Sequence, residues 1–211
     1  MPRNNTPPIF AVLGGTFDPC HSGHLSVLNQ LQQNFNPNTT CVLPASQPQH
    51  KTQTTALIHR LAMLEKLLDQ TTFTIDQTEI QYPSRGETID TVQRLRQQHP
   101  EHNILWAMGD DIFATFHTWD RWQEIRNYCN IVVIQRTRPI YHEKLKKHLA
   151  QYHNDIETLR THTHGHIYLA NWDIPTISST AIRKNPHQAK QQDQLTAPVY
   201  DYVIKHGLYD V

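Results

Sequence analysis

The sequence predicts an α/β fold in which a doubly wound parallel sheet carries helices on both faces. Two observations support this prediction. Short apolar runs alternate along the chain with segments of helical periodicity, and polar loops follow most of the apolar runs. With 211 residues the chain is long enough for a sizeable core, and we expect a single domain spanning residues 1–211.

Six runs have the composition of strands. The first, IFAVLGG, is apolar and ends in two glycines, which is typical of a buried strand followed by a tight turn. The third, FTIDQTEI, alternates polar and apolar residues, which indicates a strand with one buried face. The predicted strands span residues 9–15, 40–45, 73–80, 103–111, 130–136 and 166–171.

Seven segments have helical character. In the first, Leu25, Leu28 and Leu31 recur at helical spacing, and Ser22 is the expected N-cap. Thr88 is the expected cap of a later helix. The predicted helices span residues 22–33, 56–70, 88–100, 119–127, 141–160, 177–184 and 197–209. Strands and helices therefore alternate as in a Rossmann-like sheet.

Charge and cysteine content argue against several classes of protein. Nineteen Lys and Arg balance nineteen Asp and Glu, so no global basic field or basic stripe points to nucleic acid as a partner. Cys20, Cys41 and Cys129 form no CxxC pair, which favours a reducing cytoplasm over a disulfide framework. No segment has the character of a signal peptide or a membrane span, so we expect a cytoplasmic protein with no membrane partner. A homo-oligomer is compatible with this composition.

In a parallel α/β sheet, ligands bind outside the carboxyl ends of the strands. Four polar loops are expected at that edge because each follows a predicted strand. They span residues 14–24, 44–51, 109–119 and 172–183. These loops therefore hold the candidate site residues.

The stretch GGTFDPCHSGHL combines several features of an anion site. Gly14 and Gly15 allow a tight backbone approach, and Thr16 adds a hydroxyl and an N–H. His21 and His24 are three residues apart at the start of a helix, so they project from one face. The free N–H groups of a helix N-terminus attract anions, and the two imidazoles add further donors aimed at phosphate oxygens.

Two other interpretations of this stretch are open at the level of the residues. His21 and His24 could bind zinc, but a zinc site needs a third ligand, and none lies at motif spacing. They could also be structural histidines behind a glycine turn. The stretch is neither a GxGxxG fingerprint nor a Walker-type loop, so the two common phosphate-binding loops do not explain it.

GGTFDPCHSGHL resembles the GG-T/S-FDP-x-H-x-GH signature of the nucleotidylyltransferase superfamily. ISSTAIR, residues 177–183, resembles the second signature of that superfamily, ISST-x-x-R. Alone, ISSTAIR could be a simple serine cap, but the ordered pair is highly specific. Class I aminoacyl-tRNA synthetases share HxGH but are longer and carry a KMSKS-type loop, which is absent here. The phosphopantetheine branch usually has Thr where this chain has His21.

Further residues are similar to the nicotinate-nucleotide adenylyltransferase branch. WAMGDDIFATFHTWDRWQEI resembles its G-x-D and W-x-x-W block, QPQHK resembles its PPHK loop, and HRLAML and HGLY match other family segments. One segment departs from the family: RGETIDTV, residues 85–92, is about two residues shorter than the usual loop and lacks its Tyr. Gln49 also replaces a proline of the PPHK loop.

The resemblance implies a nucleotidylyltransferase-type fold and transfer of the adenylyl group from ATP to nicotinate mononucleotide, giving nicotinate adenine dinucleotide and pyrophosphate for NAD biosynthesis. It implies ATP and nicotinate mononucleotide as partners and Mg²⁺ bound with ATP, without a dedicated protein metal site. The nearest alternatives are a nicotinamide-mononucleotide adenylyltransferase and another small-molecule nucleotidylyltransferase. From a different class, a nucleotide-binding regulator could keep the pocket without turnover.

The resemblance also assigns residues to roles. His21, His24 and Arg183 are the expected catalytic residues, and Trp119 is expected to stack on the pyridine ring, although a Trp bridging two helices in the core is the plainer alternative. Lys51 lies in a loop that could close over a phosphate or be simply solvated. The expected ATP-binding residues are Gly14, Gly15, Thr16, Phe17, His21, His24, Gly109, Asp111, Ile177, Ser178, Ser179, Thr180 and Arg183. The expected mononucleotide-binding residues are Thr16, Lys51, Thr88 and Trp119.

Overall fold

A computed structural model describes residues 6–47, 53–82 and 87–209. Within these residues, one parallel sheet of six strands has the order β3-β2-β1-β4-β5-β6. The strand order reverses between β1 and β4, at the centre of the sheet. The predicted fold class is confirmed. The strands are β1 (Ile9–Gly15), β2 (Thr39–Pro44), β3 (Thr74–Ile75), β4 (Asn103–Gly109), β5 (Asn130–Ile134) and β6 (Ile167–Ala170).

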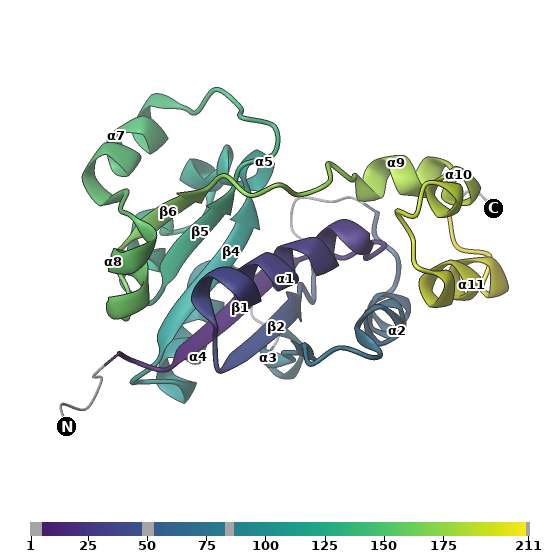
Figure 1. Ribbon diagram of the computed structural model, residues 1–211, viewed down its shortest axis with the longest axis horizontal. Coiled ribbons are helices and arrows are strands. Elements are labelled where there is room, and N and C mark those ends of the chain that lie inside the picture. The colour runs from purple at the N-terminus through teal and green to yellow at the C-terminus, as the bar shows by residue number, and fades with distance from the viewer. Residues whose placement is uncertain (1–5, 48–52, 83–86, 210–211) are drawn as a thin grey trace.

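Helices cover both faces of the sheet (Figure 1). Side chains of β1 alternate between the two cores: Ala11 and Leu13 face one, and Phe10 and Val12 face the other. The first core is completed by α1 (Ser22–Phe35), α2 (Leu57–Leu68), α8 (Ile156–Thr161), α9 (Ser179–Lys184), α10 (Pro186–Gln191) and α11 (Ala197–Lys205). The second is completed by α4 (Thr88–Gln98), α5 (Asp110–Phe113), η1 (Phe116–Thr118), α6 (Trp122–Ile125) and α7 (Glu143–Tyr152).

The prediction of a strand over residues 73–80 is largely wrong. Only Thr74–Ile75 pairs, with β2, and a short helix α3 (Thr78–Gln81) follows. The Asp76 carboxylate accepts the N–H of Thr78 at 2.8 Å, which turns the chain out of the sheet. Glu79 is buried and accepts a hydrogen bond from the Thr91 hydroxyl at 3.0 Å. The alternating pattern assigned Glu79 to a strand, whereas in the structure its side chain is held by this polar contact.

Several helix boundaries also differ from the prediction. The predicted helix over 141–160 is two helices, because the Asp155 carboxylate accepts the N–H of Thr158 at 2.8 Å and starts α8 anew. His21 and Glu87, rather than Ser22 and Thr88, occupy the N-cap positions of α1 and α4.

Several short elements were missed or misplaced. The predicted strand over 103–111 ends at Gly109, and α5 begins at the next residue. The predicted helix over 119–127 is shorter, since α6 spans only Trp122–Ile125, and η1 lies before it at Phe116–Thr118. Helix α10 was not predicted, although Asn185 and Pro186 form a standard start: the Asn185 side chain accepts the N–H of Gln188 at 3.0 Å.

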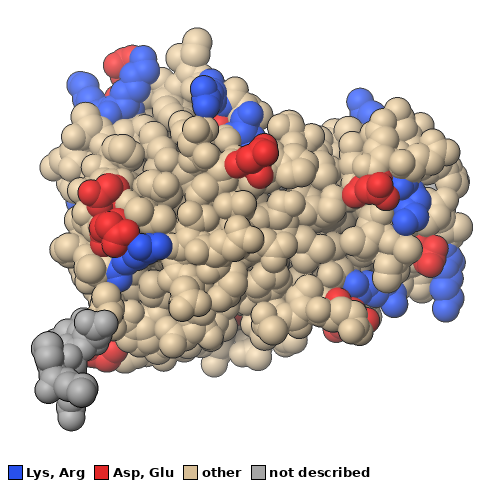
Figure 2. Space-filling view, viewed as in Figure 1, with Lys and Arg blue, Asp and Glu red and all other residues tan. Residues whose placement is uncertain are grey.

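The C-terminal helices α9, α10 and α11 gather beyond the carboxyl end of the sheet, beside α2 (Figure 1). His59 of α2 and Tyr202 of α11 share a 3.0 Å hydrogen bond, which joins the two helices. On the face shown in Figure 2, Lys, Arg, Asp and Glu are scattered around the rim and leave the centre uncharged. None of the described helices is long and apolar enough to cross a membrane.

Candidate active site

The loops that follow the strands meet at one edge of the sheet because all the strands run in the same direction. Gly15 pairs in register with Pro44, and Gly109 pairs with Ile134. The segments after β1, β2, β4 and β6 therefore begin at one edge, as the sequence predicted, and the segment after β5 joins them there.

Three glycines bring the backbone close to neighbouring side chains, Gly14 and Gly23 in the first signature segment and Gly109 at the end of β4. A Cβ on Gly14 would lie 2.7 Å from Cζ2 of Trp106, whose indole crosses the end of β1. A Cβ on Gly23 would lie 3.1 Å from the His21 ring. A Cβ on Gly109 would overlap Nη2 of Arg136, at the end of its flexible side chain. In each case the missing side chain makes room for a ring or a guanidinium at the edge of the sheet.

Phe17 shapes the turn between β1 and α1. Its φ of 53° lies in the left-handed region, which is rare for a bulky residue and marks a conformation held by its surroundings. The side chain is buried, and its ring meets the His24 ring edge-on at 4.9 Å. Phe17 therefore packs against His24 of the histidine pair, and its place among the ATP contacts stays a prediction.

His21 and His24 lie together at the start of α1. Their rings stack with centroids 3.8 Å apart, and Nδ1 of His24 accepts the backbone N–H of His21 at 3.1 Å. This bond leaves the proton of a neutral His24 on Nε2. His21 is buried, and its Nδ1 has no partner among the described residues.

The electrostatics keep His21 neutral. Burial, together with the positive charge of Arg136, lowers the pKa of His21 to about 3. Two stacked imidazoles could not both be cations without strong repulsion. The neutral His21 ring can therefore take part in hydrogen bonding to an anion at the helix N-terminus without adding a charge.

The second signature segment is bound directly to the first. Ser179 Oγ donates to the carbonyl of Pro19 at 3.0 Å, and Arg183 Nη1 donates to the carbonyl of Asp18 at 2.6 Å. The other guanidinium nitrogen, Nη2, donates to Thr180 Oγ1 at 3.3 Å. Residues more than 150 positions apart thus form one unit.

The remaining residues of that segment have local contacts. Ser178 caps α9, with its side chain accepting the N–H of Ala181 at 3.5 Å. Ile177 lies against Gly23, since a Cβ there would be 3.5 Å from Cβ of Ile177. Ile177 therefore borders the histidine segment, and the ATP-binding roles of both residues stay predictions.

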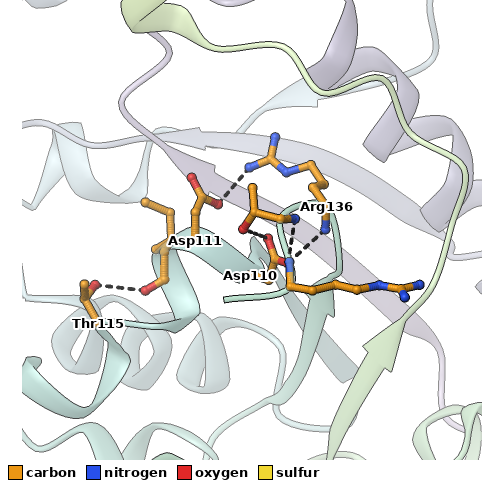
Figure 3. Close-up of polar contacts among 7 residues, drawn as sticks. Asp110, Asp111, Thr115 and Arg136 are labelled. Carbon is orange, nitrogen blue, oxygen red and sulfur yellow. Dashed lines mark hydrogen bonds and ion pairs between the residues drawn. The ribbon is translucent and has the colours of Figure 1, made fainter. Parts of the chain in front are cut away.

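Asp110 and Asp111 behave differently (Figure 3). Asp110 is fully buried, and its Oδ2 accepts the backbone N–H groups of Arg136, Thr137 and Arg138 at 2.7–2.9 Å. Its carboxylate therefore fixes the loop after β5. Asp111 is half-exposed and forms a 2.8 Å ion pair with Arg136. No group of three or more His, Cys, Asp or Glu side chains suitable for a metal occurs in the described part of the chain.

Two arginines of this edge were missed as site residues. Arg136 lies beside Asp111 and Gly109, and its buried Nε has no partner among the residues that the structure describes. Arg60 is buried and donates to the carbonyls of Thr16 and Ala45 at 2.9 and 2.8 Å. The sequence signal for Arg60 was a cation at a core-facing position of an amphipathic helix.

The predicted mononucleotide residues Thr88 and Trp119 lie in separate segments of the chain. Thr88 is the first residue of α4 and is half-buried. Trp119 follows η1, is half-buried, and meets Phe116 edge-on at 5.3 Å. Trp122 packs on both Phe116 and His148, whereas the ring contact given for Trp119 is to Phe116. Lys51 lies outside the described residues, as do residues 85–86 of the altered loop.

Comparisons with known proteins agree with this geometry. A family model described as Cytidylyltransferase-like matches residues 12–185. A protein from Pectobacterium atrosepticum named "Probable nicotinate-nucleotide adenylyltransferase" is 34% identical over 213 residues, covering 96% of this chain and 99% of the relative. The chain belongs to the nicotinate-nucleotide adenylyltransferase family.

A second relative supports the family assignment, and a solved structure supports the fold. A protein of the same name from Neisseria gonorrhoeae is 31% identical over 201 residues, covering 94% of this chain and 97% of that protein. The fold matches that of Plasmodium falciparum nicotinic acid mononucleotide adenylyltransferase complexed with NaAD, with a TM-score of 0.74, 19% identity, and coverage of 96% of this chain and 98% of the other. The resemblance stated from the sequence is confirmed.

The neutral state of His21 predicts a dependence of stability on pH. Its folded pKa of about 3 lies below the ordinary value of 6.5, so below pH 6.5 the unfolded chain binds a proton that the folded chain refuses. The free energy of unfolding should therefore fall as the pH drops from about 6.5 toward 3, by at most ~1.4 kcal/mol per pH unit from this group. Urea denaturation between pH 7.5 and 4.5 measures the slope.

The matched variant is His21→Asn. It removes the titrating ring, so the difference in bound protons between the unfolded and folded chains, which sets the slope, should fall by nearly one. His148, whose pKa burial lowers to about 4, provides a second comparison, because His148→Gln should remove a separate share of the slope. Equal slopes for the wild type and His21→Asn would contradict the neutral histidine.

Proposed function

We propose that this chain transfers the adenylyl group of ATP to nicotinate mononucleotide, giving nicotinate adenine dinucleotide and pyrophosphate. The observation that carries the proposal is the direct attachment of the second signature segment to the first, through Ser179–Pro19 and Arg183–Asp18. Family membership narrows the reaction to this adenylyl transfer. We further propose that residues 1–211 act as one cytoplasmic domain, consistent with three free, buried cysteines.

The reaction requires positioning more than proton transfer. An oxygen of the mononucleotide 5′-phosphate, already anionic, attacks the α-phosphorus of ATP. The bond from that phosphorus to the bridging oxygen breaks, and its electron pair leaves with pyrophosphate. Since no strong base is needed, catalysis depends on alignment and on stabilising the charge that builds on the phosphoryl oxygens.

The histidine pair stabilises this charge. In the proposed role, His24 donates from Nε2 to a phosphoryl oxygen, because its Nδ1 is engaged by the His21 N–H. His21 stays neutral and acts as a second donor. Gly15, Thr16 and the N-terminus of α1 contribute N–H groups to the same phosphates. The charge of Arg136, which acts electrostatically on His21, also favours an anion at this point.

Arg183 and the start of α9 hold the leaving group. One nitrogen of the guanidinium is bound by the carbonyl of Asp18, so the plane of the fork is fixed before substrate arrives. A planar fork of donors suits a pyrophosphate, and Ser178 and Thr180 add hydroxyls beside it. Gly109 and Asp111 flank the opposite side, where the half-exposed Asp111 carboxylate can accept nucleotide hydroxyls.

We propose that Mg²⁺ arrives with ATP as part of the substrate. Mg²⁺ keeps several waters and binds nucleotide phosphates without a cage of carboxylates. The donor set fits this role: Asp110 is occupied by backbone N–H groups, and Asp111 is paired with Arg136. Bound in this way, the ion neutralises charge on the triphosphate.

For the mononucleotide, we propose that Trp119 offers a flat face to the pyridine ring. Thr88 and its neighbours at the N-terminus of α4 lie in the segment where backbone N–H groups can meet the nicotinate carboxylate. Lys51 is retained as a candidate for the mononucleotide phosphate. These assignments extend the family resemblance to residues of this chain.

The function is tested by product formation from MgATP with nicotinate mononucleotide, run beside nicotinamide mononucleotide and resolved by chromatography. We expect a strong preference for the nicotinate form. A preference for nicotinamide would show that the altered loop at residues 85–92 has changed specificity. No dinucleotide from either acceptor would overturn the proposal.

His24→Ala tests the charge-stabilising role. Loss of one positioned donor should lower kcat by about 10²–10³-fold while the circular dichroism spectrum stays unchanged. His153→Ala is the control, because His153 is exposed and lies beside Ile167 at the other edge of the sheet. Near-normal turnover in His24→Ala would reject the role.

Trp119→Ala tests the stacking role. Removing the indole should raise KM for nicotinate mononucleotide about tenfold with little change in KM for ATP. Trp119→Phe retains a flat aromatic face and should recover much of the loss. An unchanged KM for the mononucleotide would leave Trp119 as a packing residue on Phe116.

A further inference from the structure

The C-terminal tail contacts the first signature loop through one side chain. Tyr209 follows α11, and its hydroxyl donates to Oδ1 of Asp18 at 2.8 Å. The other oxygen of that carboxylate, Oδ2, accepts the backbone N–H of Thr55 at 3.2 Å. Asp18 is buried, so its carboxylate is withdrawn from water. Each of its two oxygens accepts one of these hydrogen bonds in place of a water molecule.

The surroundings of Tyr209 stabilise its hydrogen bond to Asp18. The hydroxyl also lies 3.8 Å from Sδ of Met63, in the core-facing side of α2. Burial and the neighbouring Asp18 carboxylate raise the pKa of Tyr209, so the hydroxyl stays protonated and remains a donor. The backbone of Tyr209 has a φ of 68°, a conformation that a tyrosine rarely adopts unless its contacts hold it.

The same residue, Asp18, orients Arg183. Its carbonyl accepts Nη1 of Arg183 at 2.6 Å, while its side chain is held by Tyr209 and Thr55. Rotation or displacement of Asp18 would therefore move the anchor of the guanidinium. The chain of contacts runs from the last described residue, through the loop after β1, to the group proposed to receive pyrophosphate.

We propose that Tyr209 is a positioning residue, which sets the orientation of Arg183 by fixing Asp18. This inference rests on the proposed function for its kinetic consequence, but the structural coupling can be measured without turnover. The hydroxyl of Tyr209 makes no contact with substrate in this scheme. It acts through two hydrogen bonds that share Asp18.

Tyr209→Phe removes only the hydroxyl. We expect kcat for dinucleotide formation to fall by about 10–100-fold, as for a misplaced catalytic group, with KM for MgATP changed less than threefold. Tyr200→Phe is the matched control, because its hydroxyl, also on the C-terminal segment, makes an exposed 2.7 Å bond to His187. The control should keep the wild-type kcat.

A double-variant cycle separates positioning from general weakening. In an Arg183→Lys background, where no fork remains to be oriented, Tyr209→Phe should lower kcat by less than about threefold. If Tyr209→Phe lowers kcat by the same factor in the wild-type and Arg183→Lys backgrounds, the proposal is overturned. A general structural defect would lower kcat independently of residue 183. Asp18→Asn, which weakens the same contact from the other side, should reproduce the loss of kcat if Tyr209→Phe is too unstable to study.

Hydrogen exchange provides a readout independent of activity. Amides of residues 16–24 should exchange faster in Tyr209→Phe than in the wild type or Tyr200→Phe, and unchanged exchange there would overturn the proposal. If the wild type makes no dinucleotide but this exchange still rises, the proposed function fails while the coupling holds. If the wild type is active and Tyr209→Phe matches it, the coupling fails alone.

Discussion

The structure of the site depends on the backbone carbonyl groups of one turn, residues 16–19. The carbonyl of Thr16 accepts Arg60, that of Asp18 accepts Arg183, and that of Pro19 accepts Ser179. A turn that leaves a sheet cannot satisfy these carbonyls through strand pairing, and a buried carbonyl without a partner is costly. Three side chains from α2 and α9 supply the missing donors, so the loop that presents the histidines is held by the rest of the fold.

This constraint explains why parts of the chain remote from β1 matter to it. Arg60 joins the turn after β1 to the loop after β2 through the carbonyl of Ala45. Arg183 and Ser179 join it to α9. Cations are suited to these positions, because a guanidinium offers several donors in a rigid plane and can serve two loops at once.

Space and charge are arranged around the same turn. Glycines at 14, 23 and 109 admit Trp106, His21 and Arg136, so the rings and the guanidinium approach the backbone closely. Arg136 and burial together keep His21 uncharged, while Asp110 is used entirely to shape the loop that carries Arg136. Positive charge at this edge therefore comes from arginines, and the His21 imidazole remains neutral.

The sequence by itself determined the parallel α/β class, five of the six strands and the two signature segments, because apolar periodicity and glycine-rich turns are local features. It also placed His21, His24 and Arg183 at one edge, since all carboxyl ends of a parallel sheet lie together. Only the tertiary structure decided that Asp110 is structural and that Arg60 supports the turn. It alone decided that the run at 73–80 bends away after two residues, because Asp76 and Glu79 find polar partners. The roles of Asp110 and Arg60 depend on hydrogen bonds between residues far apart in the chain, and the bend at Asp76 depends on a side-chain contact that an alternating pattern does not encode.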